Sequence, residues 1–316
     1  MRLTLRQLQV FRAVYDQQSY SRAAEDMALT QPAVSLQIRQ LEELVGQPLF
    51  EYVGKKLYRT EAADALVRAS EDIFERLQSL DMQLSDLKGS LQGQLRLAVE
   101  SSAKYLTPHL FAAFKQQHPE VSLHLTVVNR AQIVKRLGDN RDDLVIMSLV
   151  PPDMALEFLP FLNYPIVAVA PPEHPLARAA RLSLRDLGAY PLLVREAGSG
   201  TRKACEEYFQ QKRAHFPQAQ EYSSSEAQRE AVVAGLGLAL LPRHAVRGEL
   251  ADGSLVELAV EELPLFRSWC VVHPRGKRLT PVAEAFFAFI REDRHRISEI
   301  AQRFEGSRTP IALATP

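Results

Sequence analysis

The segment from position 30 to 45 separates apolar from polar residues in the way that a helix with one buried face does. Its apolar residues recur at i, i+4, i+7 and i+11, namely Val34, Ile38, Leu41 and Val45. Its other face carries side chains that hydrogen-bond base edges and phosphates, namely Gln31, Ser35 and Arg39. Thr30 is a suitable N-cap, and Pro32 fits the first turn because its missing N–H has no intrahelical partner there. The pattern favours a DNA-reading helix over the alternative, a solvated amphipathic helix in an ordinary bundle.

The neighbouring patterns complete a small helical domain. Helices are predicted over residues 5–17 and 19–27, and the latter forms a helix-turn-helix with the segment from 30 to 45. Gly46 is suited to end that last helix at its C′ position.

A short hairpin is predicted from 50 to 60, with Lys55 and Lys56 near its tip. Beside a DNA-reading helix we expect these lysines to anchor phosphates, the alternative being a solvated turn. The whole chain has 38 basic and 38 acidic residues, so its net charge is zero. The charge is unevenly distributed, however, because residues 1–60 carry a net charge of +2 and residues 61–87 a net charge of −5. Positive potential is therefore confined to the N-terminal segment. Since phosphate contacts supply much of the affinity for DNA, so small a charge favours binding as a dimer or larger assembly.

A long helix is predicted from Thr60 to about Lys88. Its apolar residues repeat at heptad spacing, namely Leu66, Ile73, Leu77, Leu80, Leu84 and Leu87. Such a seam is typical of a coiled coil. The alternative is a helix packed on its own domain, but a narrow seam with charged flanks buries little unless it meets a copy of itself, so a homodimer is expected.

Beyond Gly89 and Gly93 the pattern changes to alternating strands and helices. Strands are predicted at 95–99, 123–127, 143–150, 166–170, 192–194, 239–241 and 269–273, and helices at 105–117, 131–138, 202–211, 227–234 and 281–291. This alternation is typical of parallel sheets in an α/β domain. With 316 residues, 46% of them apolar, the chain is long enough for more than one core.

The exact amino-acid sequence of the N-terminal segment indicates a family more specifically than its pattern of apolar and polar residues does. At AAEDMALTQPAVSLQIRQLEELVGQPLF, and over residues 5–65 as a whole, the chain resembles the winged helix-turn-helix of LysR-type transcriptional regulators. The resemblance implies an α+β multidomain fold: a mainly α winged helix-turn-helix domain (1–60), a linker or dimerisation helix (61–89), a two-lobed α/β effector domain similar to periplasmic binding proteins (90–302) and a C-terminal tail (303–316). Lobe boundaries are expected near 163 and 267, with one lobe over 90–163 and 267–302 and the other over 164–266.

The resemblance implies three partners: double-stranded promoter DNA, further copies of the same chain in a homodimer or homotetramer, and RNA polymerase. DNA contacts are assigned to Arg22, Thr30, Gln31, Pro32, Ser35, Gln37, Arg39, Lys55 and Lys56. Leu36 departs from the family, in which many members have a polar or basic residue at that place, so base preferences are not transferred.

In two-lobed α/β proteins a ligand lies at the carboxyl ends of strands, near helix N-termini. The residues expected there are Ser101, Ser102, Asn129, Arg130, Ser148, Glu196, Ser199, Gly200, Thr201 and Arg202. The segment REAGSGTR is the most specific, because its glycines allow close backbone approach and its hydroxyls and Arg202 would cradle an anion. The alternative for each residue is an ordinary helix cap.

Three strings of the effector part, VVNRAQIVKRLGDNRDDLVIMSLVP, PPEHPLA and REAGSGTR, resemble the CbbR subgroup. Its members control carbon-fixation operons and sense phosphorylated metabolites or NADPH. The resemblance implies a small anionic metabolite between the lobes, which would suit Arg130 and Arg202. No cofactor and no metal are expected.

The sequence leaves three other functions to consider, namely an enzyme, a redox-responsive regulator and a constitutive DNA binder. An enzyme is not expected, because no nucleophile elbow, HExxH, P-loop or GxGxxG context appears and the histidines are scattered. A redox-responsive regulator would use Cys205 and Cys270, although free cysteines are more often small buried apolar residues. A constitutive architectural DNA binder would have no effector.

Two cysteines exclude a disulfide framework and fit a reducing compartment. Since no signal core and no run of membrane-spanning length is present, a cytoplasmic protein is expected.

Overall fold

The computed structural model describes residues 3–86, 91–214 and 219–305. The chain divides into two compact units, the first ending at Asp81 and the second beginning at Met82. The first unit has its own hydrophobic core, and the second contains a larger one with two satellite clusters.

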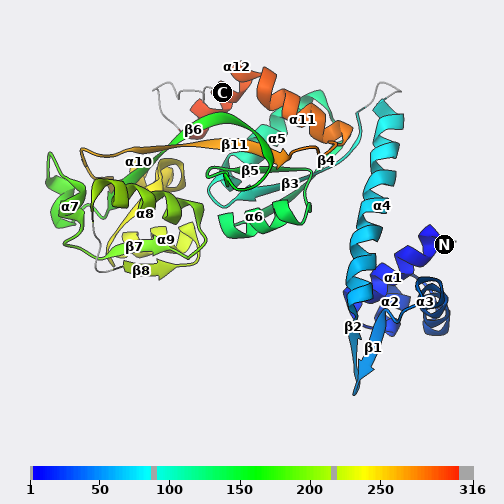
Figure 1. The fold of residues 1–316 in the computed structure, drawn as a ribbon. Helices are drawn as coiled ribbons and strands as arrows, with labels where there is room; N and C mark the ends of the chain where they lie inside the picture. Colours follow the sequence, from blue (N-terminus) through cyan, green and yellow to red (C-terminus); the bar gives the residue numbers. More distant parts are fainter. Residues whose placement is uncertain (1–2, 87–90, 215–218, 306–316) are drawn as a thin grey trace. The chain divides into compact units, whose positions relative to one another are not determined.

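The first unit is the small helical domain that the sequence predicts, followed by the start of a long helix (Figure 1). Its elements are α1 (Leu5–Gln17), α2 (Tyr20–Asp26), α3 (Gln31–Val45), the hairpin of β1 (Phe50–Val53) and β2 (Lys56–Arg59), and most of α4 (Glu61–Asp86), whose last residues belong to the second unit. The core gathers apolar residues of α1, α2 and α3 with those of the hairpin and the first turns of α4. Phe11 and Ala23 are fully buried in it, and the small side chain of Ala23 lets α2 approach its neighbours closely. The winged helix-turn-helix is confirmed.

Local chemistry sets the ends of these helices. Gly46, at φ +78°, adopts the left-handed conformation that ends α3, as predicted. Thr60 Oγ1 accepts a hydrogen bond of 3.2 Å from the N–H of Ala63 and so caps α4. Thr30 stands at the N-cap of α3, but its side chain makes no capping hydrogen bond. The cap predicted at Thr30 is therefore right in position and wrong in bonding.

The second unit is built on a mixed sheet of nine strands in the order β4-β3-β5-β11-β6-β9-β7-β8, with β10 paired to β6. The strands are β3 (Gly93–Glu100), β4 (Val121–Val128), β5 (Leu144–Met147), β6 (Leu156–Ala170), β7 (Leu192–Arg195), β8 (Ala219–Tyr222), β9 (Leu238–Pro242), β10 (Val256–Glu257) and β11 (Leu265–Pro274). The helices are α5 (Thr107–Gln117), α6 (Arg130–Gly138), α7 (Leu184–Leu187), α8 (Gly200–Lys212), α9 (Ser225–Val233), α10 (Arg247–Asp252), α11 (Pro281–Glu292) and α12 (Arg294–Glu305), with 3₁₀ turns η1 (Ala103–Tyr105), η2 (Pro175–Arg178) and η3 (Arg243–Val246).

Two long antiparallel strands, β6 and β11, correct the expectation of purely parallel sheets. They run between a parallel set of β3, β4 and β5 and a second parallel set of β7, β8 and β9. Only the last five residues of β6 were predicted, because Pro160 and Pro165 lack the backbone N–H that a strand interior uses. We call lobe I the part built on β3, β4 and β5 with α5 and α6, and lobe II the part built on β7, β8 and β9 with α8 and α9.

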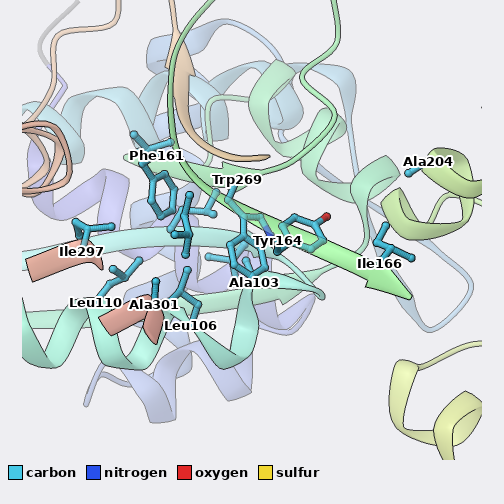
Figure 2. Packing of buried hydrophobic residues seen from close by; sticks show 14 of the residues in the cluster. Ala103, Leu106, Leu110, Phe161, Tyr164, Ile166, Ala204, Trp269, Ile297 and Ala301 are labelled. Carbon is cyan, nitrogen blue, oxygen red and sulfur yellow. The ribbon is translucent and has the colours of Figure 1, made fainter. Parts of the chain in front are cut away.

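The largest buried side chains of the second unit lie on β6 and β11. Trp269 stacks on Tyr164 with ring centroids 4.3 Å apart, and both rings are fully buried. Figure 2 shows these rings beside Ala103, and Ile297 and Ala301 near Leu110. Ile297 and Ala301 belong to α12, which was not predicted, and both are fully buried. Helix α12 therefore contributes to this core. It includes 303–305, the first three residues of the predicted tail, and the rest of that tail, 306–316, lies outside the described residues.

Candidate functional site

One side of α3 is exposed, as the pattern predicts. The residues of this recognition face, exposed or half-buried, are Thr30, Gln31, Pro32, Ser35, Leu36 and Arg39. Val34, Ile38 and Leu41 on the opposite side are buried in the core. Gln31 Nε2 donates to Ser35 Oγ at 2.8 Å, which aligns the two polar side chains along the helix. Leu36 is the exception on this face, an apolar side chain that is 55% exposed.

Gln37 does not belong to this face. It follows Ser35 by two residues, which turns it about 200° around the helix axis. Its Oε1 is buried and has no hydrogen-bond partner among the described residues. The structure thus separates Gln37 from the other expected DNA contacts of α3.

The lysines of the hairpin lie at its tip, as expected. Val53 pairs with Lys56, so Gly54 and Lys55 form a two-residue turn, and Gly54 has φ +64°. Lys55 and Lys56 are exposed, as is Arg22 on α2.

Arg59 lies close to these lysines in the sequence, but its side chain makes contacts within the domain. Its guanidinium lies 4.0 Å from the centre of the Tyr15 ring. Its Nε and Nη2 both donate to the carbonyl oxygen of Tyr15, at 2.9 and 2.6 Å. Arg59 thus fastens the hairpin to α1 and leaves the cationic surface of the hairpin to the two lysines.

The predicted seam is largely exposed on α4. Ile73, Leu77, Leu80 and Leu84 are 41%, 38%, 48% and 49% exposed. Leu66 differs because it packs against the core of the first unit, so it is not part of the exposed stripe. Leu87 lies outside the described residues.

In the second unit, the loops that follow the strands of lobe I touch those of lobe II. Asn129, after β4, caps α6 and donates through Nδ2 to Glu196 Oε1 at 3.3 Å. The N–H of Ala131 donates to the carbonyl oxygen of Gly198 at 3.1 Å. The two lobes are therefore in direct hydrogen-bonded contact at the strand ends that the sequence singled out.

Arg195, the last residue of β7, is the cation of this contact. It is the first residue of the segment REAGSGTR, but it was not among the ligand residues expected from that segment. Its side chain is 4% exposed. It donates to Glu196 through Nε at 2.8 Å and through Nη2 at 3.0 Å, to Ser225 Oγ through Nη1, and to Ser101 Oγ through Nη2 at 3.5 Å. The sequence signal for it was an arginine at the end of a buried strand, just before the glycine-containing entrance to a helix.

Glu100, the last residue of β3, is a second site residue that the sequence reasoning missed. Its Oε2 accepts from the N–H of Ser148 at 3.0 Å and from Ser148 Oγ at 2.8 Å. Its Oε1 is buried and has no hydrogen-bond partner in the described part of the chain. Burial raises the pKa of this carboxyl, against the opposing effect of the Ser148 hydrogen bonds. The carboxyl also abuts the first residue of α8, since a Cβ on Gly200 would lie 2.5 Å from Oε1.

Ser102 forms a polar link between the lobes rather than an open ligand group. Its carbonyl oxygen bonds His244 Nε2 at 2.9 Å, and its Oγ accepts from Trp269 Nε1 at 3.3 Å. His244 belongs to η3 and packs against Tyr105, Tyr164 and Trp269. Burial lowers the pKa of His244 to about 4, so the ring is neutral at physiological pH.

The predicted cluster at the start of α8 is only partly available to a ligand. Ser199 Oγ caps the helix by accepting from the N–H of Arg202 at 3.4 Å, and Thr201 is buried. Arg202 donates to Glu206 at 2.7 Å, to Glu221 at 2.6 Å and to the carbonyl oxygen of Arg195 at 2.9 Å. The expectation that Arg202 cradles an anion is therefore not supported, because two carboxylates already neutralise it.

Arg130 borders the same region from lobe I. Its Nε donates to the carbonyl oxygen of Leu149 at 2.8 Å. With Arg202 and Lys203 it lines a pocket of about 370 Å³ that extends from the start of α6 along α8. Glu226 on α9 is bonded by both Lys104 and Tyr105. Burial alone would raise the pKa of Glu226, but these hydrogen bonds outweigh it and lower the pKa to about 2.

Both cysteines are buried and free, and burial raises the pKa of each thiol to about 12. Among the residues that the structure describes, no group of three or more His, Cys, Asp or Glu side chains is placed to bind a metal ion. None of the helices in the described ranges combines the length and the hydrophobicity that a membrane crossing requires.

Comparisons with known proteins account for both units. The family described as "Bacterial regulatory helix-turn-helix protein, lysR family" matches residues 5–64, and "LysR substrate binding domain" matches residues 88–294. The "RuBisCO operon transcriptional regulator" of Allochromatium vinosum is 41% identical over 297 residues, which cover 94% of this chain and 98% of that protein. The "HTH-type transcriptional regulator CbbR" of Rhodospirillum rubrum is 43% identical over 287 residues, covering 91% and 95%.

A solved structure of a regulatory domain is similar to the second unit. It is the regulatory domain of CcmR from Synechocystis PCC6803, in complex with 2-PG. It is 35% identical, covers 63% of this chain and 96% of that one, and superimposes with a TM-score of 0.59.

Proposed function

The chain belongs to the LysR family of DNA-binding transcriptional regulators, and we propose that a small anionic metabolite bound between lobes I and II controls how it binds promoter DNA. It is a regulator and not an enzyme. The observation that carries the proposal is the buried Arg195 guanidinium, which meets Ser101 of lobe I where polar strand ends of the two lobes touch. Its action on promoter DNA would take place in the cytoplasm.

We assign base contacts to the recognition face of α3 and phosphate contacts to Arg22, Lys55 and Lys56. Helix α3 is the element that presents Gln, Ser and Arg side chains outward from a rigid core, as major-groove reading requires. The exposed lysines of the hairpin and Arg22 on α2 flank it in sequence on either side.

The DNA assignment is tested with the double substitution Gln31→Ala and Ser35→Ala in a promoter shift assay. Both side chains lie outside the buried positions of α3, so the fold is retained. We expect loss of preference for the operator, at about 1–3 kcal/mol per lost base contact. The matched control is Gln37→Ala, which leaves the recognition face intact. Operator preference retained by the double variant would refute the assignment.

The stripe formed by Ile73, Leu77, Leu80 and Leu84 supports a homodimer. Four large apolar side chains at heptad spacing are exposed on one helix, and pairing with a second copy would bury them. A dimer doubles the DNA contacts of a domain with a net charge of only +2 over residues 1–60. Two dimers would form the homotetramer, and RNA polymerase is the further partner through which such a regulator acts.

The names of the relatives support the class of metabolite. The relative from Allochromatium vinosum is named as a regulator of the RuBisCO operon, and the CcmR regulatory domain is described in complex with 2-PG. An anion would find the guanidinium of Arg195 beside the hydroxyl of Ser101, with Asn129, Ser148, Glu196, Ser199, Gly200 and Thr201 around it. Ser102, Arg130 and Arg202 are bonded within the protein, so we assign them to the frame of the site.

The switch would be a change in lobe contact. A ligand alters DNA binding only if its affinity differs between two arrangements of the lobes. The bonds that join the lobes here, from Asn129 to Glu196 and from Ala131 to Gly198, are the ones that a ligand would change.

The effector proposal is tested by thermal-shift titration of the whole chain with 2-PG, other phosphorylated compounds, carboxylates and nicotinamide nucleotides. A ligand that binds only the folded state raises the melting temperature. Ser101→Ala combined with Thr201→Val should reduce the shift, whereas Ser254→Ala, on a turn of lobe II, should not. A shift that is unchanged in the double variant would move the site elsewhere.

The redox-responsive function has no supporting observation. A thiol whose pKa is raised to about 12 is almost entirely protonated at neutral pH, and the thiolate is the reactive form. Alkylation of the native protein decides the matter: two unreactive thiols exclude the redox function, and rapid labelling of either would revive it.

A further inference from the structure

Glu196 already occupies the position of an anion between the lobes. Its carboxylate accepts from Arg195 Nε at 2.8 Å and Nη2 at 3.0 Å, and from Asn129 Nδ2 of lobe I at 3.3 Å. Two parallel N–H···O bonds from one guanidinium are the geometry in which arginine also binds free carboxylates and phosphates. The side chain of Glu196 is 17% exposed, so this carboxylate stands at the border between the buried arginine and solvent.

Arg195 is held more firmly than Glu196. Arg195 ends strand β7, is 4% exposed, and its other nitrogen donates to Ser225 Oγ. Glu196 begins the loop to α8, in which Gly198 has φ +95°. The cation is therefore fixed by a sheet and the anion is carried by a loop.

We propose that Glu196 is a built-in anion that the effector displaces. This inference rests on the proposed function and names the group that an anionic effector must replace. The phosphate or carboxylate of the effector takes the two donors of Arg195 together with Ser101 Oγ and Asn129 Nδ2, and Glu196 turns out toward solvent. Glu196 already takes Nε and Nη2 of Arg195, so an effector anion that binds these same two donors would lie directly against the Glu196 carboxylate. Their repulsion is little screened in so buried a site, and the effector therefore replaces Glu196.

Displacement of Glu196 would change the hydrogen bonds between the two lobes. The Glu196 loop includes Gly198, whose carbonyl oxygen accepts from the N–H of Ala131 in lobe I. Moving the loop changes this bond and the Asn129–Glu196 bond together, so the exchange of one anion for another alters how the lobes are joined. Glu196 thereby sets both the affinity for the effector and the state of the protein without it.

The test uses Glu196→Gln, which keeps the shape of the side chain and removes its charge. Without ligand, this variant leaves a buried arginine uncompensated and should melt at a lower temperature than the wild type. With inorganic phosphate as the probe, its affinity should rise by about tenfold or more, the loss of one charge-assisted competitor. Phosphate should therefore raise its melting temperature more than that of the wild type.

Two further variants make the result specific. Glu206→Gln removes a carboxylate from Arg202 on the same helix and should leave phosphate affinity unchanged. Arg195→Gln should abolish phosphate binding. If Glu196→Gln does not fold, Glu196→Asp retains the charge on a shorter arm and should show a smaller gain in affinity.

The outcomes separate the two proposals. If Arg195→Gln loses phosphate binding but Glu196→Gln binds no more tightly than the wild type, displacement is wrong and the anion site stands. If neither the wild type nor Glu196→Gln binds phosphate, and the effector panel raises no melting temperature, the anionic effector and the displacement both fail. Promoter binding by α3 is measured separately and is unaffected by either result.

Discussion

Replacing Gly200 by alanine should disturb the contact between the lobes. A Cβ at this position would lie 2.5 Å from Glu100 Oε1, 3.0 Å from its Cδ and 3.2 Å from its Oε2. Glu100 is 2% exposed, and its Oε2 holds both the N–H and the hydroxyl of Ser148. The carboxyl therefore has no open space to withdraw into and moves only at the expense of these two hydrogen bonds.

The size of the effect follows from these contacts. Overpacking of a tight site costs about 1–3 kcal/mol, and each weakened hydrogen bond adds up to about 1 kcal/mol. Alanine in place of glycine in a helix returns at most about 1 kcal/mol. We expect the Gly200→Ala variant to be less stable by about 1–3 kcal/mol, and for a unit of this size each kcal/mol lowers the melting temperature by about 2–4 °C.

The assay is thermal unfolding of the whole chain, followed by circular dichroism. Gly248→Ala is the matched control, because Gly248 lies in helix α10 and nothing lies within 4 Å of the Cβ that it would gain. The control should melt at the wild-type temperature or slightly above it. A Gly200→Ala variant as stable as Gly248→Ala would refute the close approach of Glu100 to α8.

Three further predictions concern charge, assembly and pH. Changing both Lys55 and Lys56 to Ala should weaken DNA binding uniformly across sequences and make the slope of log binding constant against log salt concentration shallower by about 2. Shift assays at several salt concentrations measure this slope, and an unchanged slope would exclude phosphate contacts at the hairpin tip. Leu77→Glu with Leu84→Glu should convert the proposed dimer into monomers in sedimentation, whereas Glu75→Gln should not; a dimer that survives the double substitution would place the interface elsewhere. Because the folded-state pKa of His244, about 4, lies below its ordinary value of 6.5, the folded chain binds fewer protons than the unfolded one in that range, so the free energy of unfolding should fall as pH is lowered from 6.5 to 4. Denaturation of His244→Gln should lack this part of the pH dependence, and His295→Gln, whose ring is 87% exposed, should keep it.

The helical domain was predictable because its signals are local. The spacing of Val34, Ile38 and Leu41 requires one buried face and so determines which side of α3 stays exposed. Gly46 ends α3 and Thr60 caps α4 through the chemistry of the residues themselves. The side-chain hydrogen bonds of this domain did not follow from the local signals. The Thr30 side chain makes no capping hydrogen bond, and Arg59 binds the carbonyl oxygen of Tyr15 in α1, 44 positions away in the sequence.

In the second unit, local patterns predicted the elements but not how they pair. The sequence determined that strands and helices alternate, that polar residues follow the strands, and that α4 carries an apolar stripe, because each of these is a pattern within a few turns of chain. Only the tertiary structure decided that β6 and β11 run antiparallel through the sheet, that Arg195 rather than Arg202 is the buried cation, and that Glu100 lies against Gly200. These outcomes depend on pairings between residues that lie as much as 118 positions apart, as Leu156 and Pro274 do in β6 and β11. The charge that a site presents is therefore set by which partners meet there, not by which residues the chain contains.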